Sequence, residues 1–273
     1  MVSRFLLTLI LSIALVNSSC GPLSDGASGL SQNQFESSKY YFSSVKKVAV
    51  EVIYEQGADP YIGMTQTPYN RIPYWQILEE NLRALYQGRT LQPQFVVPKD
   101  LTQMRQITKQ NKTEWTDQEI YDLSETVRLN HSSSEQAHFL VLFLNGYYKS
   151  SAGVQPKTLG VSIGGTSVIA MFKQVIEASS SAIASSTDKY VEQSTLVHEM
   201  GHALGLVNNG LPMVNGHDDL QHTTHCSNPN CVMYWENSGS QALSAFINKI
   251  NQTGSVVMFD SACLNDARNF MVQ

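Results

Sequence analysis

The residues that could do chemistry are concentrated in one short stretch, TLVHEMGHALGLVNNG, at positions 195–210. It contains His198 and His202, four residues apart, with Glu199 directly after the first of them. On a helix, side chains with this spacing stand on one face with their Cβ atoms roughly 5–6 Å apart. Two imidazoles placed in this way can bind one Zn²⁺ ion. The spacing therefore predicts a zinc site on a helix.

Glu199 lies beside the first of these ligands, and the sequence predicts that it is a general base. A zinc ion with one open position lowers the pKa of a coordinated water towards about 7 and polarises a carbonyl group. A neighbouring carboxylate can then accept the proton of that water while its oxygen attacks a peptide carbonyl. The pattern thus predicts a zinc-dependent endopeptidase that hydrolyses peptide bonds through a metal-activated water.

A catalytic zinc site of this kind needs a third protein ligand and one open position. Five of the seven histidines of the chain lie between positions 198 and 225, so the segment after the predicted helix is rich in candidates. An acidic third ligand, by contrast, would place the chain in another branch of the zinc peptidases. The candidates are His217, His222, His225, Asp218 and Glu236.

The segment HEMGHALGLVN resembles the metzincin pattern HExxHxxGxxH, in which the glycine turns the chain and the next histidine is the third ligand. At that last position this chain has Asn208, and asparagine is a poor zinc ligand. Further along, HCSNPNCVM at 225–233 is similar to the stretch that directly follows the glycine in archaemetzincins. The resemblance implies that VNNGLPMVNGHDDLQHTT is an insertion and that His225 is the third ligand.

The same resemblance implies roles for further residues. Met233 would lie under the metal ion as the methionine of the Met-turn. His217 is the main rival of His225, because it lies closer to the helix and has acidic neighbours that could orient its ring. Tyr234 is a candidate oxyanion donor, since a tyrosine near this methionine aids catalysis in several metzincins. A strand edge at Ser162–Val168 would pair with the extended substrate backbone.

Archaemetzincins also carry a later pair of cysteines that helps to hold a second zinc ion. Here only Cys263 follows the Met-turn, so we expect one catalytic zinc ion and no second, structural one. A disulfide between Cys226 and Cys231 fits an exported protein better, because disulfides persist in oxidising compartments.

Residues 1–20, MVSRFLLTLILSIALVNSSC, predict an export signal, since Arg4 precedes an apolar run from Phe5 to Val16. Cys20, which follows small polar residues, resembles the lipidated cysteine of bacterial lipoproteins. We therefore expect an exported protein that contacts a bacterial membrane only through this lipid anchor, or one that is otherwise periplasmic or secreted.

The composition restricts the partners and the domain organisation. The chain has 273 residues and a formal net charge of −5, so it lacks the basic character of a nucleic-acid-binding protein and we expect a protein or peptide substrate. Residues 21–44 are rich in serine, glycine and glutamine and predict a flexible spacer. Residues 45–273 would then form a single zinc metalloprotease domain.

Hydrophobic periodicity predicts strands that alternate with helices. The expected strands lie near 45–55, 93–97, 137–148 and 160–172, and the expected helices at 74–86, 116–129, 186–207 and 241–250. The first strand alternates apolar and polar residues, which predicts one buried face. The fold class is therefore predicted to be α+β, with an α/β-like upper lobe: a zincin-like or metzincin-like mixed sheet, an active-site helix and an irregular C-terminal lobe.

One alternative belongs to a different class of protein, namely an exported surface lipoprotein whose metal site is structural or degenerate. Asn208, in place of the expected ligand, is the feature that supports it. Glu199 argues against it, because a purely structural site has no use for a carboxylate beside its first ligand.

Overall fold

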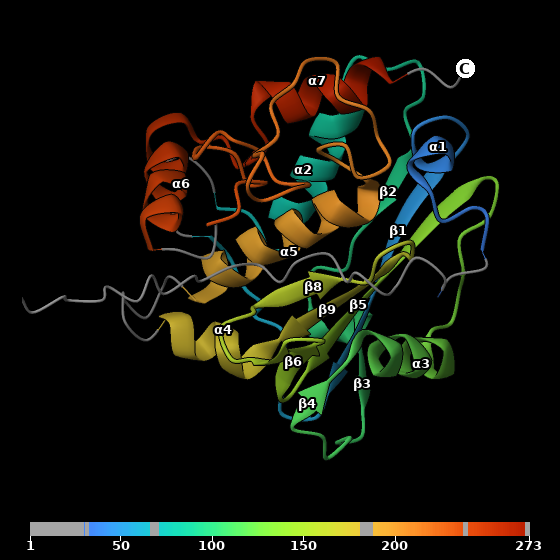
Figure 1. The fold of residues 1–273 in the computed structure, drawn as a ribbon, viewed down its shortest axis with the longest axis vertical. Coiled ribbons are helices and arrows are strands. Elements are labelled where there is room, and N and C mark those ends of the chain that lie inside the picture. Colours follow the sequence, from blue (N-terminus) through green and yellow to red (C-terminus); the bar gives the residue numbers. More distant parts are fainter. Residues whose placement is uncertain (1–29, 31–32, 66–70, 181–187, 237–239, 271–273) are drawn as a thin grey trace, which may run out of the picture.

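The computed structural model describes residues 30, 33–65, 71–180, 188–236 and 240–270 (Figure 1). The predicted export signal at 1–20, with Cys20, lies outside these residues. None of the helices in the described part of the chain is both long enough and apolar enough to cross a bilayer.

The described residues form a six-stranded mixed sheet in the order β2-β1-β5-β9-β8, with β3 also paired to β1. Neighbouring strands are parallel except β8, which runs antiparallel to β9 and forms one edge. The strands are β1 (Lys47–Glu55), β2 (Gln94–Val96), β3 (Arg105–Ile107), β5 (Gln136–Leu144), β8 (Gly160–Ser162) and β9 (Val168–Phe172). A sheet of this kind combined with helices confirms the predicted α+β class.

Helices cover both faces of this sheet. In Figure 1, α5 runs alongside β8 and β9, and α2 lies beside it and contacts both α5 and β2. α6 and α7 lie on the side of α5 away from β8, and α3 lies across the sheet from α5. The helices are α1 (Ser38–Tyr41), α2 (Gln76–Tyr86), α3 (Asp117–Val127), α4 (Lys173–Ser180), α5 (Asp188–Leu204), α6 (Ser240–Thr253) and α7 (Ser261–Asn269), with a 3₁₀ turn at Leu101–Gln103. The predicted helices at 74–86, 116–129, 186–207 and 241–250 are therefore confirmed.

The central strands are buried on both faces, because parallel strands are flanked by helices on each side. In β1, Val48 and Val50 are buried, and so are Ala49 and Ile53 of the opposite face. The prediction of one buried face was therefore wrong for this strand. The predicted single strand at 137–148 is also wrong, because β5 ends at Leu144.

Three short strands form a small second sheet, in the order β4-β6-β7. Its strands are β4 (Glu114–Trp115), β6 (Tyr147–Ser150) and β7 (Gly153–Gln155). The break between β5 and β6 falls at Gly146, whose φ is +94°. A Cβ at this position would lie 2.7 Å from the Thr113 carbonyl oxygen, so the turn requires glycine.

The folded part begins earlier than the predicted spacer boundary at residue 44. Tyr41 and Phe42 are buried in the main core, and Ser38 Oγ donates a buried 2.7 Å hydrogen bond to the Leu204 carbonyl. A stretch of mostly polar residues thus folds because its aromatic side chains bury apolar surface. The polar composition of residues 21–44 does not reveal this boundary, because it does not indicate that Tyr41 and Phe42 are buried.

A buried ion pair fastens this N-terminal segment to the sheet. The Glu36 and Arg128 side chains are each 1% exposed, with Glu36 Oε1 3.4 Å from Arg128 Nη2. Ser167 donates to both carboxylate oxygens, through its backbone N–H at 3.1 Å and its hydroxyl at 2.8 Å.

The irregular C-terminal lobe extends from the end of α5 to residue 236 with two later helices, α6 and α7. The helix α7 was not predicted. Asp260 is its N-cap residue and accepts a 2.9 Å hydrogen bond from the Cys263 backbone N–H. α7 contacts α2, and α2 in turn contacts α5.

We predict that Glu36→Ala destabilises the protein by about 3 kcal/mol, because the buried Arg128 would lose one of its two carboxylate partners and keep only Glu125, 3.3 Å away. Urea denaturation of the variant measures this change. Lys46→Ala is the matched control: Lys46 and Glu135 form an exposed ion pair, 71% and 66% accessible, worth about 1 kcal/mol or less. Equal shifts for the two variants would contradict the assignment of Glu36 to a buried, structural ion pair.

Candidate metal centre

Three histidines converge at the buried face of α5. His198 and His202 lie one turn apart on this helix, and His225 joins them from the segment that follows the predicted insertion. Their ring centroids are 4.6, 5.3 and 4.9 Å apart, and one nitrogen of each ring lies within 4.8 Å of the others. We call these three residues the histidine cluster.

Backbone carbonyls set the orientation of two of these rings. His198 Nδ1 donates to the Val232 carbonyl at 2.6 Å, and His225 Nδ1 donates to the Thr223 carbonyl at 3.0 Å. Because a carbonyl only accepts, each of these rings carries its proton on Nδ1 and turns the Nε2 lone pair towards the cluster. His198 Nε2 and His202 Nε2 are 3.0 Å apart, and His225 Nε2 is buried without a hydrogen-bond partner among the described residues.

The electrostatics favour neutral rings. Burial, together with the neighbouring His225, lowers the pKa of His198 to about 3. Burial and the two other rings hold the pKa of His202 well below its ordinary value, and burial also lowers the pKa of His225. Neutral imidazole is the form that binds metal ions. The cluster therefore offers three inward-facing neutral rings that could hold one ion.

Met233 packs on the backbone of α5. A Cβ on Gly201 would lie 2.3 Å from Met233 Sδ, so this methionine packs directly on the helix backbone between the two helical histidines. Met233 is fully buried, and its carbonyl accepts a 2.8 Å hydrogen bond from the Cys226 N–H. It thus lies against the helix that carries His198 and His202.

Gly205 ends the helix as the sequence predicts. Its φ is +87°, and a Cβ there would lie 2.1 Å from Ser38 Oγ. Both the backbone conformation and the close approach therefore require glycine. Asn208, three residues later, also has a positive φ, +59°, and is not part of the histidine cluster.

The other candidates for the third ligand point elsewhere. His217 Nε2 lies 2.6 Å from Asp266 Oδ2, and His222 stacks on Trp235 with ring centroids 3.9 Å apart. Burial acts to lower the pKa of His217, but its bonds to Asp266 and Cys226 outweigh this and raise the pKa. The acidic alternatives, Asp218 and Glu236, are also outside the histidine cluster.

The edge strand β8 lies against α5. A Cβ on Gly160 would lie 3.0 Å from Thr195 Cγ2 and 3.1 Å from Glu199 Cγ, so the Glu199 side chain extends towards this strand. The predicted substrate-binding edge was Ser162–Val168. Only its first residue lies on the edge, because Val168 begins β9, which pairs on both sides.

A cavity of about 260 Å³ adjoins the histidine cluster. His202 and Ala203 line one side of it, Ser162 and the β8–β9 turn line another, and the N-terminal segment at 36–39 closes it. There is thus open space beside the metal-ligand candidates, next to the sheet edge.

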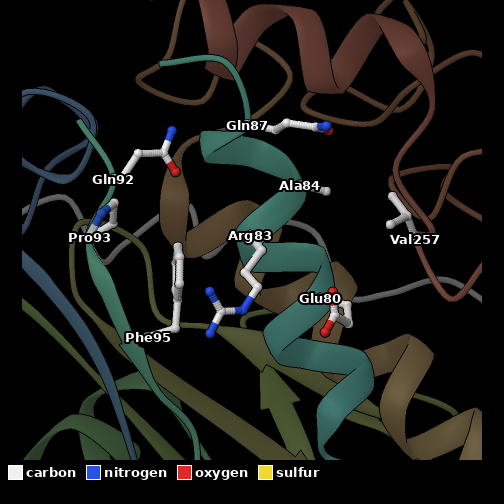
Figure 2. Close-up of a pocket in the computed structure, with 8 residues that line it drawn as sticks. All are labelled: Glu80, Arg83, Ala84, Gln87, Gln92, Pro93, Phe95 and Val257. Atoms are coloured by element: carbon white, nitrogen blue, oxygen red, sulfur yellow. The ribbon is translucent and has the colours of Figure 1, made fainter. Parts of the chain in front are cut away.

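A second cavity lies far from these residues, between α2 and β2. It has a volume of about 420 Å³ and is lined by the eight residues labelled in Figure 2, none of which is a histidine or cysteine. Its cation, Arg83, is paired with Glu79 at 2.6 Å and lies over the Phe95 ring. This cavity therefore offers no comparable chemistry.

A second group of possible metal ligands, the cysteine cluster, lies close to the first. Its members are Cys226, Cys231, Asp260 and Cys263, whose ligand atoms lie within 4.8 Å of one another. All three cysteines are buried free thiols, and Cys231 Sγ is 3.5 Å from Cys263 Sγ. The predicted Cys226–Cys231 disulfide is therefore absent, because the fold gathers a third thiol and a carboxylate around this pair.

Sequence reasoning missed Asp260 and Cys263 as members of this cluster. The available signal was their spacing: a carboxylate at the N-cap of a helix and a thiol three residues later lie close together in the first helical turn. Hydrogen bonds from the Cys231 and Cys263 thiols hold the pKa of Cys226 well below its usual range, whereas burial raises the pKa of Cys231. The cluster thus favours the thiolate form of Cys226 over that of Cys231.

Comparisons of the chain with protein-family models, with curated proteins and with solved structures found no match. The geometry of the two clusters is therefore the basis for the function proposed below.

We predict that Gly201→Ala lowers the stability by about 1–3 kcal/mol and weakens metal binding by the histidine cluster, because the added methyl group displaces Met233. Thermal denaturation with and without zinc measures both effects. Gly216→Ala is the control, since a Cβ there meets nothing within 4 Å. If Gly201→Ala behaved like this control, Met233 could not be packed against the helix as described.

Proposed function

We propose that the protein is a zinc-dependent endopeptidase. The observation that carries this proposal is the histidine cluster with Glu199 adjacent to it on the same helix. Three imidazole ligands suit zinc and leave one of its four coordination positions open, which distinguishes catalytic sites from closed structural ones. His225 would be the third ligand. A zinc ion held there would supply a Lewis acid that polarises a carbonyl and lowers the pKa of a coordinated water.

The remaining chemistry belongs to the chain itself. Glu199 is 2% exposed and extends between α5 and the edge strand, so its carboxylate is placed to accept a proton and return it to the leaving amine. The open edge of β8 at Gly160–Ser162 can pair with an extended peptide backbone by strand addition. This pairing would hold the scissile bond of a protein or peptide substrate across the histidine cluster.

The cavity beside His202 supports this reading. It opens next to the edge strand, so a peptide paired with β8 could place one side chain in it. Its walls are built from small and polar residues of the N-terminal segment and the β8–β9 turn. Tyr234, half-buried next to Met233, remains a candidate oxyanion donor.

We further propose that the cysteine cluster holds a second, structural zinc ion, in place of the single ion expected from the sequence. Three thiols and a carboxylate would fill all four positions of a tetrahedral site, and four protein ligands distinguish closed, structural sites from catalytic ones. Bound metal would also shield the thiols from oxidation in the exported, lipid-anchored protein that the first 20 residues predict.

We expect Glu199→Gln to retain its zinc and to lose peptide hydrolysis by about 10²–10⁴-fold, because the amide cannot accept the proton. Zinc analysis and cleavage of a casein substrate or peptide library measure the two properties. Glu114→Gln, an exposed change on β4, is the control. Retained hydrolysis in a zinc-loaded Glu199→Gln protein would refute the peptidase proposal and favour the alternative of a non-enzymatic surface lipoprotein.

The third ligand can be tested separately. We expect His225→Ala to reduce the zinc content by about one ion per chain, because two protein ligands do not hold zinc tightly. His222→Ala is the matched control. It should keep its full zinc content, because the His222 ring stacks on Trp235 and is not part of the histidine cluster. Loss of zinc in His222→Ala or in His217→Ala, with normal content in His225→Ala, would contradict the assignment.

A further inference from the structure

The two clusters share one stretch of backbone. His225 of the histidine cluster directly precedes Cys226 of the cysteine cluster. At the other end of the stretch, Cys231 directly precedes Val232, whose carbonyl orients His198 through the 2.6 Å hydrogen bond. His225 is thus itself adjacent to a member of the cysteine cluster, and His198 is oriented by a residue adjacent to another member.

The shared stretch, residues 225–234, is closed on itself by backbone hydrogen bonds. The Cys226 N–H donates to the Met233 carbonyl at 2.8 Å, and the Tyr234 N–H donates to the Cys231 carbonyl at 3.0 Å. A further bond, from the Val232 N–H to the Met258 carbonyl at 3.0 Å, joins it to the segment before α7. Movement at the cysteines therefore moves the Val232 carbonyl and the His225 ring.

The side-chain contacts between members of the cysteine cluster are weak. Cys226 Sγ lies 3.7 Å from Asp260 Oδ2, and Cys231 Sγ lies 3.5 Å from Cys263 Sγ. Hydrogen bonds that involve thiols are weak. A metal ion bound to all four side chains would replace these contacts with bonds of about 2.3 Å to sulfur and would tie the shared stretch to the start of α7.

The surroundings of the cysteine cluster are suited to this role. The Asp260 and Asn228 backbone N–H groups lie 3.4 and 3.5 Å from Cys231 Sγ and Cys226 Sγ, where they offset negative charge on sulfur. Asp260 Oδ1 accepts from the Cys263 N–H, and Oδ2 accepts from Asn228 Nδ2 at 2.8 Å. These two hydrogen bonds fix the orientation of the Asp260 carboxylate.

We infer that a metal ion in the cysteine cluster positions the histidine cluster and increases its affinity for metal. The inference rests on the two proposed metal sites and not on the proposed peptidase activity. Groups that orient metal ligands typically change metal affinity by 10–100-fold when they are lost, and we expect a change of about this size. Because coupling between two binding equilibria is reciprocal, metal in the histidine cluster must increase the affinity of the cysteine cluster by the same factor.

The test uses the full chain and its Cys263→Ser and Asp260→Asn variants. Co²⁺ reports the cysteine cluster through a near-ultraviolet thiolate-to-metal absorption band, and a chromophoric chelator measures Zn²⁺ affinity at the histidine cluster. We expect both variants to weaken or lose the thiolate band and to lower the Zn²⁺ affinity of the histidine cluster by about 10–100-fold. Ser261→Ala, an exposed change in the same turn of α7, is the matched control and should change neither.

A second measurement avoids the risk that a variant fails to fold. In the unmodified chain, Cd²⁺ at one equivalent fills the thiolate site first, because soft thiolate ligands prefer it. Zn²⁺ affinity at the histidine cluster is then compared with and without Cd²⁺, and the Cd²⁺-loaded protein should bind more tightly. Unchanged Zn²⁺ affinity, or the absence of any thiolate-to-metal band, would overturn the inference. Tighter binding without any peptide hydrolysis would instead support the coupling and refute the proposed activity.

Discussion

Three imidazole rings buried around one point impose the constraint on which the rest of the site depends. Their facing nitrogens are 3.0 Å apart at the closest, and the three residues are each at most 5% exposed. One ring can donate a proton to another, but His225 Nε2 and His202 Nδ1 still have no partner among the described residues. Buried polar atoms without partners are costly, and a shared cation removes the cost at the Nε2 atoms.

Three neighbouring segments pack closely on α5 at positions where a glycine leaves room. The edge strand β8 contacts the helix at Gly160, Met233 contacts it at Gly201, and the N-terminal segment contacts it at Gly205. In each case a Cβ would fall within 3.1 Å of a neighbouring atom. Glycine inside a helix lowers the stability of the helix by about 1 kcal/mol relative to alanine. Gly201 therefore destabilises α5, but it leaves room for the Met233 side chain.

The sequence predicts those features that depend on short-range patterns. The spacing of His198, Glu199 and His202 predicts their shared helix face, and the turn at Gly205 follows from the same stretch. The convergence of His225 was implied only by the family resemblance. Spacing and charge alone left His217 as a strong rival, and its acidic partner turned out to be the distant Asp266.

The features that the sequence does not predict depend on contacts between distant segments. Cys263 and Asp260 reach Cys231 only because α7 packs beside α2, which no local pattern encodes. The N-terminal segment looked like a spacer, since its polar composition concealed the burial of Tyr41 and Phe42. Compositional averages do not register a few aromatic side chains that find a core.

The attachment of the N-terminal segment has a consequence for the cavity beside His202. Residues 36–39 form one wall of this cavity, and Glu36, which pairs with Arg128, is among them. The other walls come from the end of α5 and from β8 with the turn that follows it, so separate parts of the fold enclose the space. The buried ion pair of Glu36 therefore also determines how firmly this space is closed.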